Sequence, residues 1–310
     1  MDITRSEIAS ARHRIEPDIR HTPLLRIRGS QLGIDCAQLW LKLEHLQVGG
    51  SFKARGMFNR MRANPIPGAG VVIASGGNAG IAVAYAAKSL GVRCEVFVPE
   101  TASRAKREKL AQLEAVVSVG GASYADALAA SLERQAQTGA LLMHAYDQPE
   151  VVIGAGTLGA EVEQDAGVPD RVLVSVGGGG LIAGVAAWFE DRCRIVALEP
   201  ELAPTLFRAR EAGRPVDVEV SGIAADSLGA RRVGTIAWEI AQRHVHEAHL
   251  LGDPAIRAAQ EALWSKLRLA VEPAAALPLA ALTTGIVVPR SDENVLLVIC
   301  GANLDLASLS

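Results

Sequence analysis

Apolar and polar residues follow one another along this chain in two distinct periods. Short apolar runs, typical of buried strands, occupy residues 40–44, 71–74, 93–98, 115–119, 171–176, 194–198 and 295–299. Segments with helical spacing occupy residues 5–16, 53–62, 78–90, 103–113, 122–137, 150–164, 181–189, 235–243, 254–267 and a stretch that begins at 273. Residues 208–217 show neither period and are expected to form a loop. Strands that alternate with helices predict an α/β fold with mostly parallel, doubly wound sheets.

A cluster of helix-breaking residues marks a predicted crossing between two domains. Pro65, Pro67 and Gly68 lie close together there, directly after the helical segment 53–62. The α/β unit at 68–147 is expected to form a small inserted domain. Residues 1–67 and 148–310 are then expected to form a large domain.

Composition narrows the functional classes. The 310 residues are 49% hydrophobic with a formal net charge of −3, which favours neither nucleic acid nor an anionic membrane as partner. The four cysteines are scattered without a CxxC pair, which argues against a disulfide framework or a zinc site. The charged N-terminal segment is unlike a signal peptide, and no apolar run reaches spanning length. We therefore expect a soluble cytoplasmic protein.

Lys53 lies where a predicted strand leads into a predicted helix, directly after Gly50, Ser51 and Phe52. Ligand sites of α/β folds commonly occupy such strand ends. A desolvated amine there can lose its proton and form a Schiff base with an aldehyde cofactor. Most lysines are instead solvated surface residues, so the rest of the chain must decide between the two interpretations.

Four successive glycines, Gly177, Gly178, Gly179 and Gly180, separate a predicted strand from a predicted helix that begins at Leu181. Glycines let the backbone approach an anion and direct several N–H groups at it. The positive end of the following helix adds to this attraction. A phosphate site is the favoured interpretation, because a merely flexible loop is unusual between two strongly apolar elements.

A second loop, at 75–78, also connects a strand to a helix. Ser75 supplies a hydroxyl, Asn78 supplies an amide, and Gly76 and Gly77 leave the backbone N–H groups accessible to a carboxylate. An ordinary N-cap of the helix 78–90 explains the same residues. Both interpretations remain open on the pattern alone.

Residues 154–159 read GAGTLG, a literal GxGxxG motif. A dinucleotide-binding fingerprint requires a full strand before the glycines and an acidic residue at the end of the next strand. Only three apolar residues precede the motif, and the predicted strand 171–176 ends without an acid. We expect a glycine-rich helix packed closely on a sheet, and a nicotinamide oxidoreductase is disfavoured.

Several motifs together resemble the fold type II pyridoxal-phosphate enzymes, whose fold is that of the tryptophan synthase β-subunit. These are KLE at 42–44, GSFKARG at 50–56, the segment 75–87, and GGGGLIAG at 177–184. Their order and spacing most resemble the serine/threonine dehydratases (ammonia-lyases), with serine racemase close by. The resemblance extends from HTPL at 21–24 to CGAN at 300–303, which is nearly the whole chain.

The resemblance implies a pyridoxal 5′-phosphate site centred on Lys53. Lys53 would hold the cofactor covalently and act as the base at the substrate Cα, with Phe52 against the cofactor ring. The phosphate would lie on the glycine loop, which comprises Gly177, Gly178, Gly179, Gly180 and the N–H of Leu181.

Other roles also follow from the resemblance. Asn78 would hydrogen-bond the 3′-oxygen of the ring, and Ser75, Gly76, Gly77 and Asn78 would bind the substrate carboxylate. Cys300 would face the pyridine nitrogen. A neutral thiol does not hold that nitrogen protonated as an aspartate does, which suits elimination more than transamination. For a strand cysteine alone, a buried small apolar role is the more common one.

The implied reaction is dehydration and deamination of L-serine or L-threonine to a 2-oxo acid and ammonia. Serine racemases place a second serine where this chain has Gly76, so racemisation is disfavoured but stays an alternative. A 3-hydroxyaspartate lyase and a β-replacement enzyme are further alternatives. Cysteine synthases usually carry SVKDR where this chain reads SFKAR. A non-catalytic ligand-binding protein would not need Lys53.

A divalent-metal site is not expected, because Thr205 stands where the racemase branch has a carboxylate. Glu199 and Ala203 keep the rest of that pattern, so they are candidates for a monovalent-cation site. The resemblance also implies a homodimer and a small-molecule amino-acid substrate.

Overall fold

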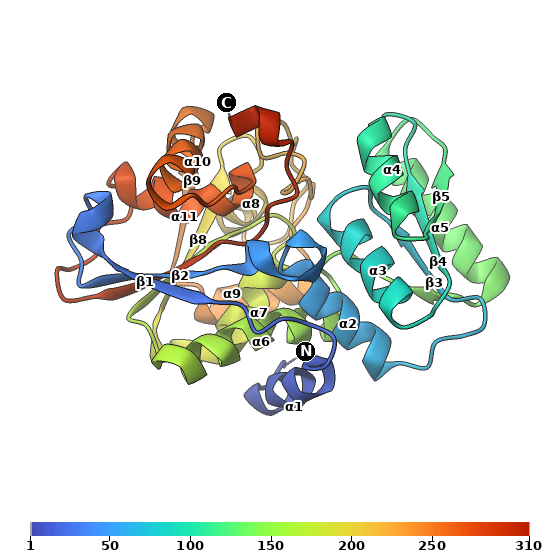
Figure 1. Ribbon diagram of the computed structural model, residues 1–310, viewed down its shortest axis with the longest axis horizontal. Coiled ribbons are helices and arrows are strands. Elements are labelled where there is room, and N and C mark those ends of the chain that lie inside the picture. Colours follow the sequence, from blue (N-terminus) through green and yellow to red (C-terminus); the bar gives the residue numbers. More distant parts are fainter. Residues whose placement is uncertain (1, 310) are drawn as a thin grey trace.

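The computed structural model describes residues 2–309 and contains two sheets (Figure 1). The larger sheet has the strand order β1-β2-β10-β7-β8-β9, and only the β1–β2 pair is antiparallel. Its strands are β1 (Leu24–Arg28), β2 (Gln38–Lys42), β7 (Arg171–Ser175), β8 (Arg194–Pro200), β9 (Glu247–Leu251) and β10 (Asn294–Val298). The smaller sheet is wholly parallel in the order β5-β4-β3-β6. Its strands are β3 (Val71–Ala74), β4 (Cys94–Val98), β5 (Val116–Val119) and β6 (Leu141–Leu142).

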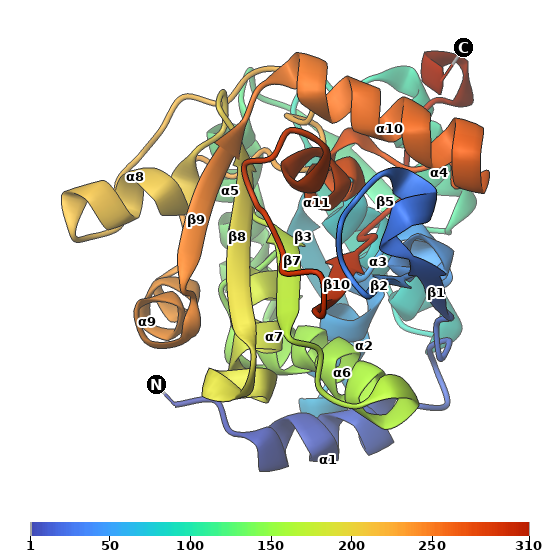
Figure 2. The ribbon, with the colours of Figure 1, turned by 90° about the vertical axis from the view of Figure 1, so that its left-hand side faces the viewer.

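Helices cover both faces of each sheet, as the predicted doubly wound fold requires (Figures 1 and 2). On the large sheet, α6 (Pro149–Ala166), α7 (Gly180–Phe189) and α9 (Thr235–His244) lie on one face, with α1 (Arg5–Ile15) outside α6. The opposite face carries α10 (Asp253–Leu267) and α11 (Pro273–Thr283). On the small sheet, α3 (Asn78–Ser89) and α4 (Arg104–Gln112) lie together, and α5 (Tyr124–Thr138) packs on β3 and β4. The two-domain α/β architecture is thereby confirmed.

Helix α2 (Lys53–Ala63) connects the two halves of the molecule. It packs against α6 on one side and α3 on the other. Its buried apolar residues, Met57 and Phe58 among them, belong to the same hydrophobic cluster as Ile73 of the small sheet. The proposed domain boundaries at residues 67–68 and 147–148 stay a prediction, since α2 precedes the first of them yet shares the core of the small sheet.

The structure differs from the predicted secondary structure in four elements. Strands β1, β6 and β9 were not among the predicted strands. β6 has only two residues, and β9 carries polar side chains (Glu247, His249) at the sheet edge. The expected loop at 208–217 is helical in its first part, since α8 spans Thr205–Ala212. The carboxylate of Glu199 accepts the N–H groups of Leu206 and Phe207 at the start of α8. This capping group belongs to the preceding strand β8. The residues next to the start of α8 therefore carry no capping pattern from which the helix could be predicted.

The GxGxxG segment lies inside α6, as expected, and its glycines lie against neighbouring helices. A Cβ atom on Gly154 would lie 2.5 Å from the carbonyl oxygen of Arg55 in α2. A Cβ on Gly156 would lie 2.8 Å from the carbonyl oxygen of Gly184 in α7. The glycines therefore permit close helix–helix contact, and the segment lacks the strand–turn–helix form of a dinucleotide site.

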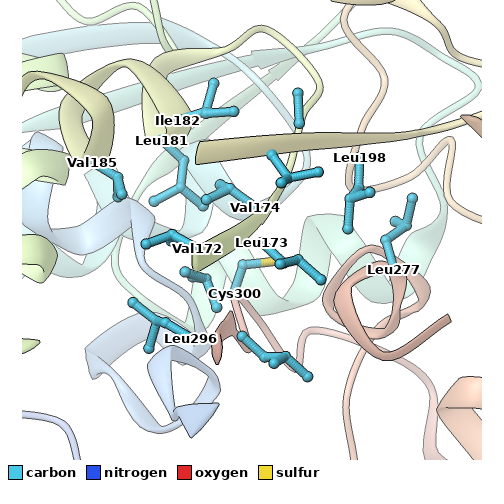
Figure 3. Close-up of a cluster of buried hydrophobic side chains, with 14 of the residues drawn as sticks. Val172, Leu173, Val174, Leu181, Ile182, Val185, Leu198, Leu277, Leu296 and Cys300 are labelled. Atoms are coloured by element: carbon cyan, nitrogen blue, oxygen red, sulfur yellow. The ribbon is translucent and has the colours of Figure 1, made fainter. Parts of the chain in front are cut away.

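The core of the large sheet reaches to the edge of the candidate site. Val172, Leu173, Leu296 and Leu277, from β7, β10 and α11, are fully buried, and Cys300 belongs to the same cluster (Figure 3). Among residues 2–309, no helix combines the length and apolar character needed to cross a membrane.

Candidate active site

One small pocket, of about 40 Å³, collects the residues that were predicted to bind a cofactor. It lies at the carboxyl ends of β7 and β10, which are neighbours in the parallel sheet. The predicted residues that line it are Phe52, Lys53, Asn78, Gly177, Gly178, Gly179, Gly180, Leu181 and Cys300. Five further lining residues were not predicted, namely Ser175, Ser227, Leu228, Glu272 and Ala274.

The backbone brings Lys53 next to Cys300, although 247 positions separate them in sequence. The N–H of Phe52 donates to the carbonyl oxygen of Cys300 at 3.0 Å, and Ser51 forms an isolated antiparallel bridge with Gly301. The segment that begins α2 is thus attached to the chain just beyond β10. Tertiary contacts, not local sequence, place the amine in the pocket.

Lys53 is poised to lose its proton. Burial lowers the pKa of its amine to about 8, and the nearby Cys300 and Glu272 only partly oppose this effect. Its Nζ donates to the carbonyl oxygen of Ala145 at 2.6 Å and lies 5.1 Å from the centre of the Phe52 ring. A neutral amine is the form that attacks an aldehyde or accepts a proton from carbon.

A buried ionic cluster holds the Lys53 helix in position. The guanidinium of Arg55 donates to Glu44, just after β2, and to Glu161 of α6 at distances of 2.6–2.8 Å. Lys42 Nζ lies 2.7 Å from the same Glu161 carboxylate. Although burial alone raises the pKa of Glu161, Arg55 and Lys42 lower it to about 2. The KLE and GSFKARG motifs therefore meet in one cluster that joins β2, α2 and α6.

The glycine loop has no room for side chains. A Cβ on Gly178 would lie 2.3 Å from the ring of Tyr146, and one on Gly180 would lie 2.9 Å from the carbonyl oxygen of the same tyrosine. Gly179 has φ of +87°, a conformation that glycine adopts without strain, and a Cβ there would lie 2.6 Å from Ala237 Cβ. The loop ends at the N-terminus of α7, where backbone N–H groups attract anions.

The chemistry of the groups that line the pocket therefore suits a phosphorylated aldehyde. It combines a desolvated amine with a side-chain-free loop at a helix N-terminus, which are the two features that pyridoxal phosphate needs for covalent and phosphate attachment. The Cys300 thiol is also suited to its expected place, because burial raises its pKa well above the usual value and keeps it neutral. The roles of the individual side chains stay predictions.

The residues predicted to bind the substrate carboxylate lie beside this pocket. Gly76, Gly77 and Asn78 line an adjoining cleft of about 790 Å³, which shares Asn78, Ser227 and Glu272 with the Lys53 pocket. Ser75 lines neither cavity, and its Oγ accepts the N–H of Gly77 at 3.3 Å. A Cβ on Gly76 would meet only Val98 at 3.4 Å, so this position has space for a side chain.

Asn78 is already hydrogen-bonded at both ends of its amide. Its Nδ2 donates to the carboxyl oxygens of Glu272 at 2.8 and 3.0 Å, and its Oδ1 accepts from Asn303 Nδ2 at 2.6 Å. Glu272 was missed by sequence reasoning. Its one sequence signal is that it is the only charged residue in the apolar stretch 269–289.

The residues proposed for a monovalent-cation site, Glu199 and Ala203, form hydrogen bonds with other groups of the protein. The Glu199 carboxylate accepts the N–H groups of Leu206 and Phe207 at 2.8 and 2.7 Å, and Thr205 Oγ1 lies 2.9 Å from it. The carbonyl oxygen of Ala203 accepts the N–H of Thr205 at 3.2 Å. Within residues 2–309, no three histidine, cysteine, aspartate or glutamate side chains are grouped as metal ligands. The monovalent-cation site stays a prediction.

Comparison with known proteins places the chain in a family. Residues 15–301 match the family described as "Pyridoxal-phosphate dependent enzyme". The chain is 34% identical to a phenylserine dehydratase of Ralstonia pickettii, over 98% of this chain and 94% of that protein. It is 35% identical to an L-threonine ammonia-lyase of Geobacter sulfurreducens, over 98% of this chain and 76% of that protein.

The fold comparison agrees with the family match. The structure of maize serine racemase superposes with a TM-score of 0.92 at 29% identity, covering 100% of this chain and 96% of that one. The family match spans the motif residues 42–56 and the glycine loop, and the pocket brings the Lys53 amine and that loop together. The chain therefore belongs to the fold type II pyridoxal-phosphate-dependent enzymes, within their dehydratase and ammonia-lyase group.

Proposed function

We propose that this enzyme removes water and ammonia from L-serine or L-threonine and releases the corresponding 2-oxo acid. The observation that carries the proposal is the joint placement of Lys53, the glycine loop and the neutral Cys300 thiol in one pocket. When bound, pyridoxal phosphate supplies the electron sink for cleavage at the substrate Cα. The dehydratases and ammonia-lyases among the relatives support the same reaction class.

Lys53 is the proposed base. Its pKa of about 8 leaves about a tenth of the amine neutral at pH 7, far more than an ordinary lysine does, and the neutral form can accept the α-proton of the substrate. The hydrogen bond to the carbonyl oxygen of Ala145 orients the Nζ atom within the pocket. The Arg55 cluster holds the first turn of α2, so that the amine returns to the same place after each turnover.

The remaining residues of the site are proposed to bind and orient the cofactor and the substrate. The N–H groups of Gly177–Gly180 and Leu181 are proposed to hold the phosphate, and Phe52 to lie against the cofactor ring. The loop at 75–78 is proposed to hold the substrate carboxylate at the border between the pocket and the cleft. Because Cys300 is buried and neutral, it would face the pyridine nitrogen of the cofactor without placing a charge there.

Gly76 favours elimination over racemisation. Inversion at Cα needs a second proton-transferring group on the face opposite to the lysine, and a glycine has no side chain to provide one. The main alternative is nevertheless a serine racemase, because the fold superposes closely on the maize enzyme of that name. A 3-hydroxyaspartate lyase or a β-replacement enzyme would use the same Lys53.

The test is a substrate panel on the purified, cofactor-loaded protein. We expect 2-oxo acid and ammonia in equal amounts from L-serine or L-threonine, with phenylserine and 3-hydroxyaspartate as competing substrates and chiral analysis of residual serine. Oxo acid from only one of the competitors would reassign the substrate. D-serine without oxo acid would assign a racemase.

Lys53→Ala should remove the absorbance band of the lysine-bound cofactor and lower turnover by about 10³-fold or more, because both the attachment and the base are lost. Lys88→Ala is the matched control, since this exposed lysine of α3 contacts only Gln112 and Glu114 in the hydrogen bonds and ion pairs of the described residues. Undiminished turnover in Lys53→Ala would refute the assignment of the base.

We further propose that the protein acts in the cytoplasm as a homodimer. All four cysteines are free and buried, which is compatible with a reducing compartment. The dimer rests on the family resemblance, and light scattering on the purified enzyme tests it.

A further inference from the structure

Residues 144–147, here called the support segment, lie behind the Lys53 pocket and do not line it. The segment connects β6 of the small sheet to α6. It contacts both parts of the site: the carbonyl oxygen of Ala145 accepts from Lys53 Nζ at 2.6 Å, and the Tyr146 ring lies against Gly178. The position of this segment therefore bears on the amine and on the glycine loop.

Hydrogen bonds within the support segment give it a fixed shape. His144 Nδ1 accepts the backbone N–H groups of Tyr146 and Asp147 at 3.3 and 2.9 Å. The side chain of Gln148 accepts the N–H of His144 at 2.8 Å. The rings of His144 and Tyr146 meet edge to face, with their centres 4.6 Å apart. The segment is thus a tight turn whose side chains have defined directions.

The carboxylate of Asp147 extends from this turn to the beginning of α9. Its Oδ2 accepts the N–H of Thr235 and its Oδ1 accepts the N–H of Ile236, both at 3.0 Å. A Cβ atom on Gly234 would lie 2.7 Å from Oδ1, so a glycine at this position lets the carboxylate approach the helix. The first N–H groups of a helix have no acceptor within it, and an anion is favourable there. Asp147 therefore caps α9 from a distant part of the chain.

The first turn of α9 lies against the glycine loop. The N–H of Gly234 donates to the carbonyl oxygen of Gly178 at 3.0 Å. A Cβ atom on Gly179 would lie 2.6 Å from Ala237 Cβ, so the loop and the helix are in close contact. Within residues 2–309, no side chain caps α7, the helix that follows the loop. Of the two helices that begin at the glycine loop, α9 is capped by Asp147 and α7 keeps its N–H groups for an anion.

We propose that Asp147 is a positioning residue for the phosphate group of the cofactor. It holds the first turn of α9 and thereby fixes the carbonyl of Gly178 and the backbone of Gly179. It also occupies the N-terminus of α9, which leaves α7 as the helix that binds the phosphate. This inference rests on the proposed function, because it takes the glycine loop as the phosphate site. Asp147 acts through α9 and does not itself touch the cofactor.

The experiment separates the phosphate site from the lysine with two probes, inorganic phosphate and pyridoxal, which has the aldehyde but no phosphate. Both are titrated into the full-length protein without cofactor, phosphate by calorimetry and pyridoxal by absorbance. In Asp147→Ala we expect phosphate to bind about tenfold more weakly, because α9 loses two charge-assisted hydrogen bonds and the loop loses its support. Pyridoxal attachment should change by less than about twofold, since His144 and Gln148 still hold Ala145 beside Lys53.

Two further variants separate positioning from charge and from helix capping in general. Asp147→Asn removes the charge but keeps one acceptor oxygen, so phosphate should bind with an affinity between those of the wild type and Asp147→Ala. Tighter phosphate binding in both Asp147 variants would show that the carboxylate merely repels the anion, and would overturn the inference. Asp126→Ala is the matched control, because Asp126 also accepts two backbone N–H groups at a helix start, that of α5, and it should leave both affinities unchanged.

Two other results would also contradict the inference. Phosphate affinity in Asp147→Ala equal to that of the wild type would show that the cap does not position the loop. An equal loss of phosphate and pyridoxal binding would show a general structural role. If Asp147→Ala does not fold, as judged by circular dichroism, the comparison of Asp147→Asn with the wild type decides. A wild-type protein that binds phosphate but takes up neither pyridoxal nor pyridoxal phosphate would instead refute the proposed function, and the phosphate titrations still decide on Asp147.

Discussion

At the scale of single residues, the site depends on where side chains are missing. The Tyr146 ring lies against Gly178 so closely that a Cβ atom on this residue would not fit. Gly76, in contrast, has space beside it for a side chain, so no steric requirement for glycine arises at this position.

Gly178→Ala should weaken pyridoxal phosphate binding by tenfold or more. The added Cβ would lie 2.3 Å from the Tyr146 ring, so the loop or the ring must move away and its N–H groups lose their alignment. Equilibrium titration of the cofactor absorbance measures the effect. Gly120→Ala, where a Cβ would meet nothing within 4 Å, should bind the cofactor as the wild type does; equal affinities for both variants would contradict the proposed phosphate loop.

Gly76→Ser should introduce racemisation of L-serine. A hydroxyl placed beside Val98 fits without displacement of the backbone and offers a proton-transferring group. We expect D-serine formation to rise by about tenfold or more, within the range of general acid–base catalysis. Chiral chromatography measures the D-serine formed. Gly76→Ala is the control, because it adds a methyl group without the hydroxyl. Equal D-serine formation in both variants would exclude a role for the hydroxyl.

At the scale of elements, the ionic cluster around Arg55 explains why the lysine motif extends past the lysine. Arg55 is fully buried and joins α2 to the end of β2 and to α6 through Glu44 and Glu161. A buried cluster of this kind stabilises the fold only while all of its charged partners are present, because removal of one partner leaves uncompensated charge. The helix that carries Lys53 is therefore fixed by charges on two other elements.

Arg55→Met should lower the free energy of unfolding by about 3–5 kcal/mol, since Glu44 and Glu161 lose their main partner in a buried site. Urea unfolding monitored by circular dichroism gives the value. Arg104→Met replaces an exposed arginine of an i,i+4 pair with Glu108 and should change stability by no more than about 0.5 kcal/mol. A similar small change for Arg55→Met would show that the cluster does not stabilise the fold.

At the scale of the whole molecule, two buried carboxyl groups shape the pH dependence of stability. Burial raises the pKa values of Glu199 and Glu272 to about 7, above the usual 4.5. Between these values the folded protein binds more protons than the unfolded chain does, so stability falls as pH rises from about 4.5 to 7. Glu161, whose pKa is about 2, acts oppositely and loses its stabilising contribution as pH falls from 4.5 to 2.

We therefore expect Glu199 and Glu272 to make the cofactor-free protein less stable as pH rises from about 4.5 to 7, whereas the lowered pKa values of His45 and His144 act in the opposite direction. Glu272→Gln should flatten the decline between pH 5 and 7.5, because the glutamine has no proton to lose there. Thermal unfolding across that range measures the change, with Glu100→Gln, an exposed position, as the control. A decline that is equally steep in Glu272→Gln would show that this carboxyl does not titrate with a raised pKa.

Sequence patterns alone predicted most elements, the parallel topology and the loops that meet in the pocket. Apolar residues repeat with the period of a strand or a helix because one face of the element is buried. The elements β3, α3 and α11 can therefore be predicted from their own residues. The glycine loop and Lys53 are recognisable because their chemistry imposes particular residue types at fixed places beside predicted elements. Edge strand β9 and helix α8 escaped prediction, since their partners or caps lie elsewhere in the chain.

The sequence by itself determined the fold class, the family and the lysine at the centre of the site. Only the tertiary structure decided which groups surround that lysine. Glu272, Asn303 and Arg55 act through contacts with residues 11 to 225 positions away, as between Arg55 and Glu44 or between Asn303 and Asn78. Burial and the distance between charges exist only once the two sheets have formed. The ionisation of the buried groups is therefore a property of the folded molecule.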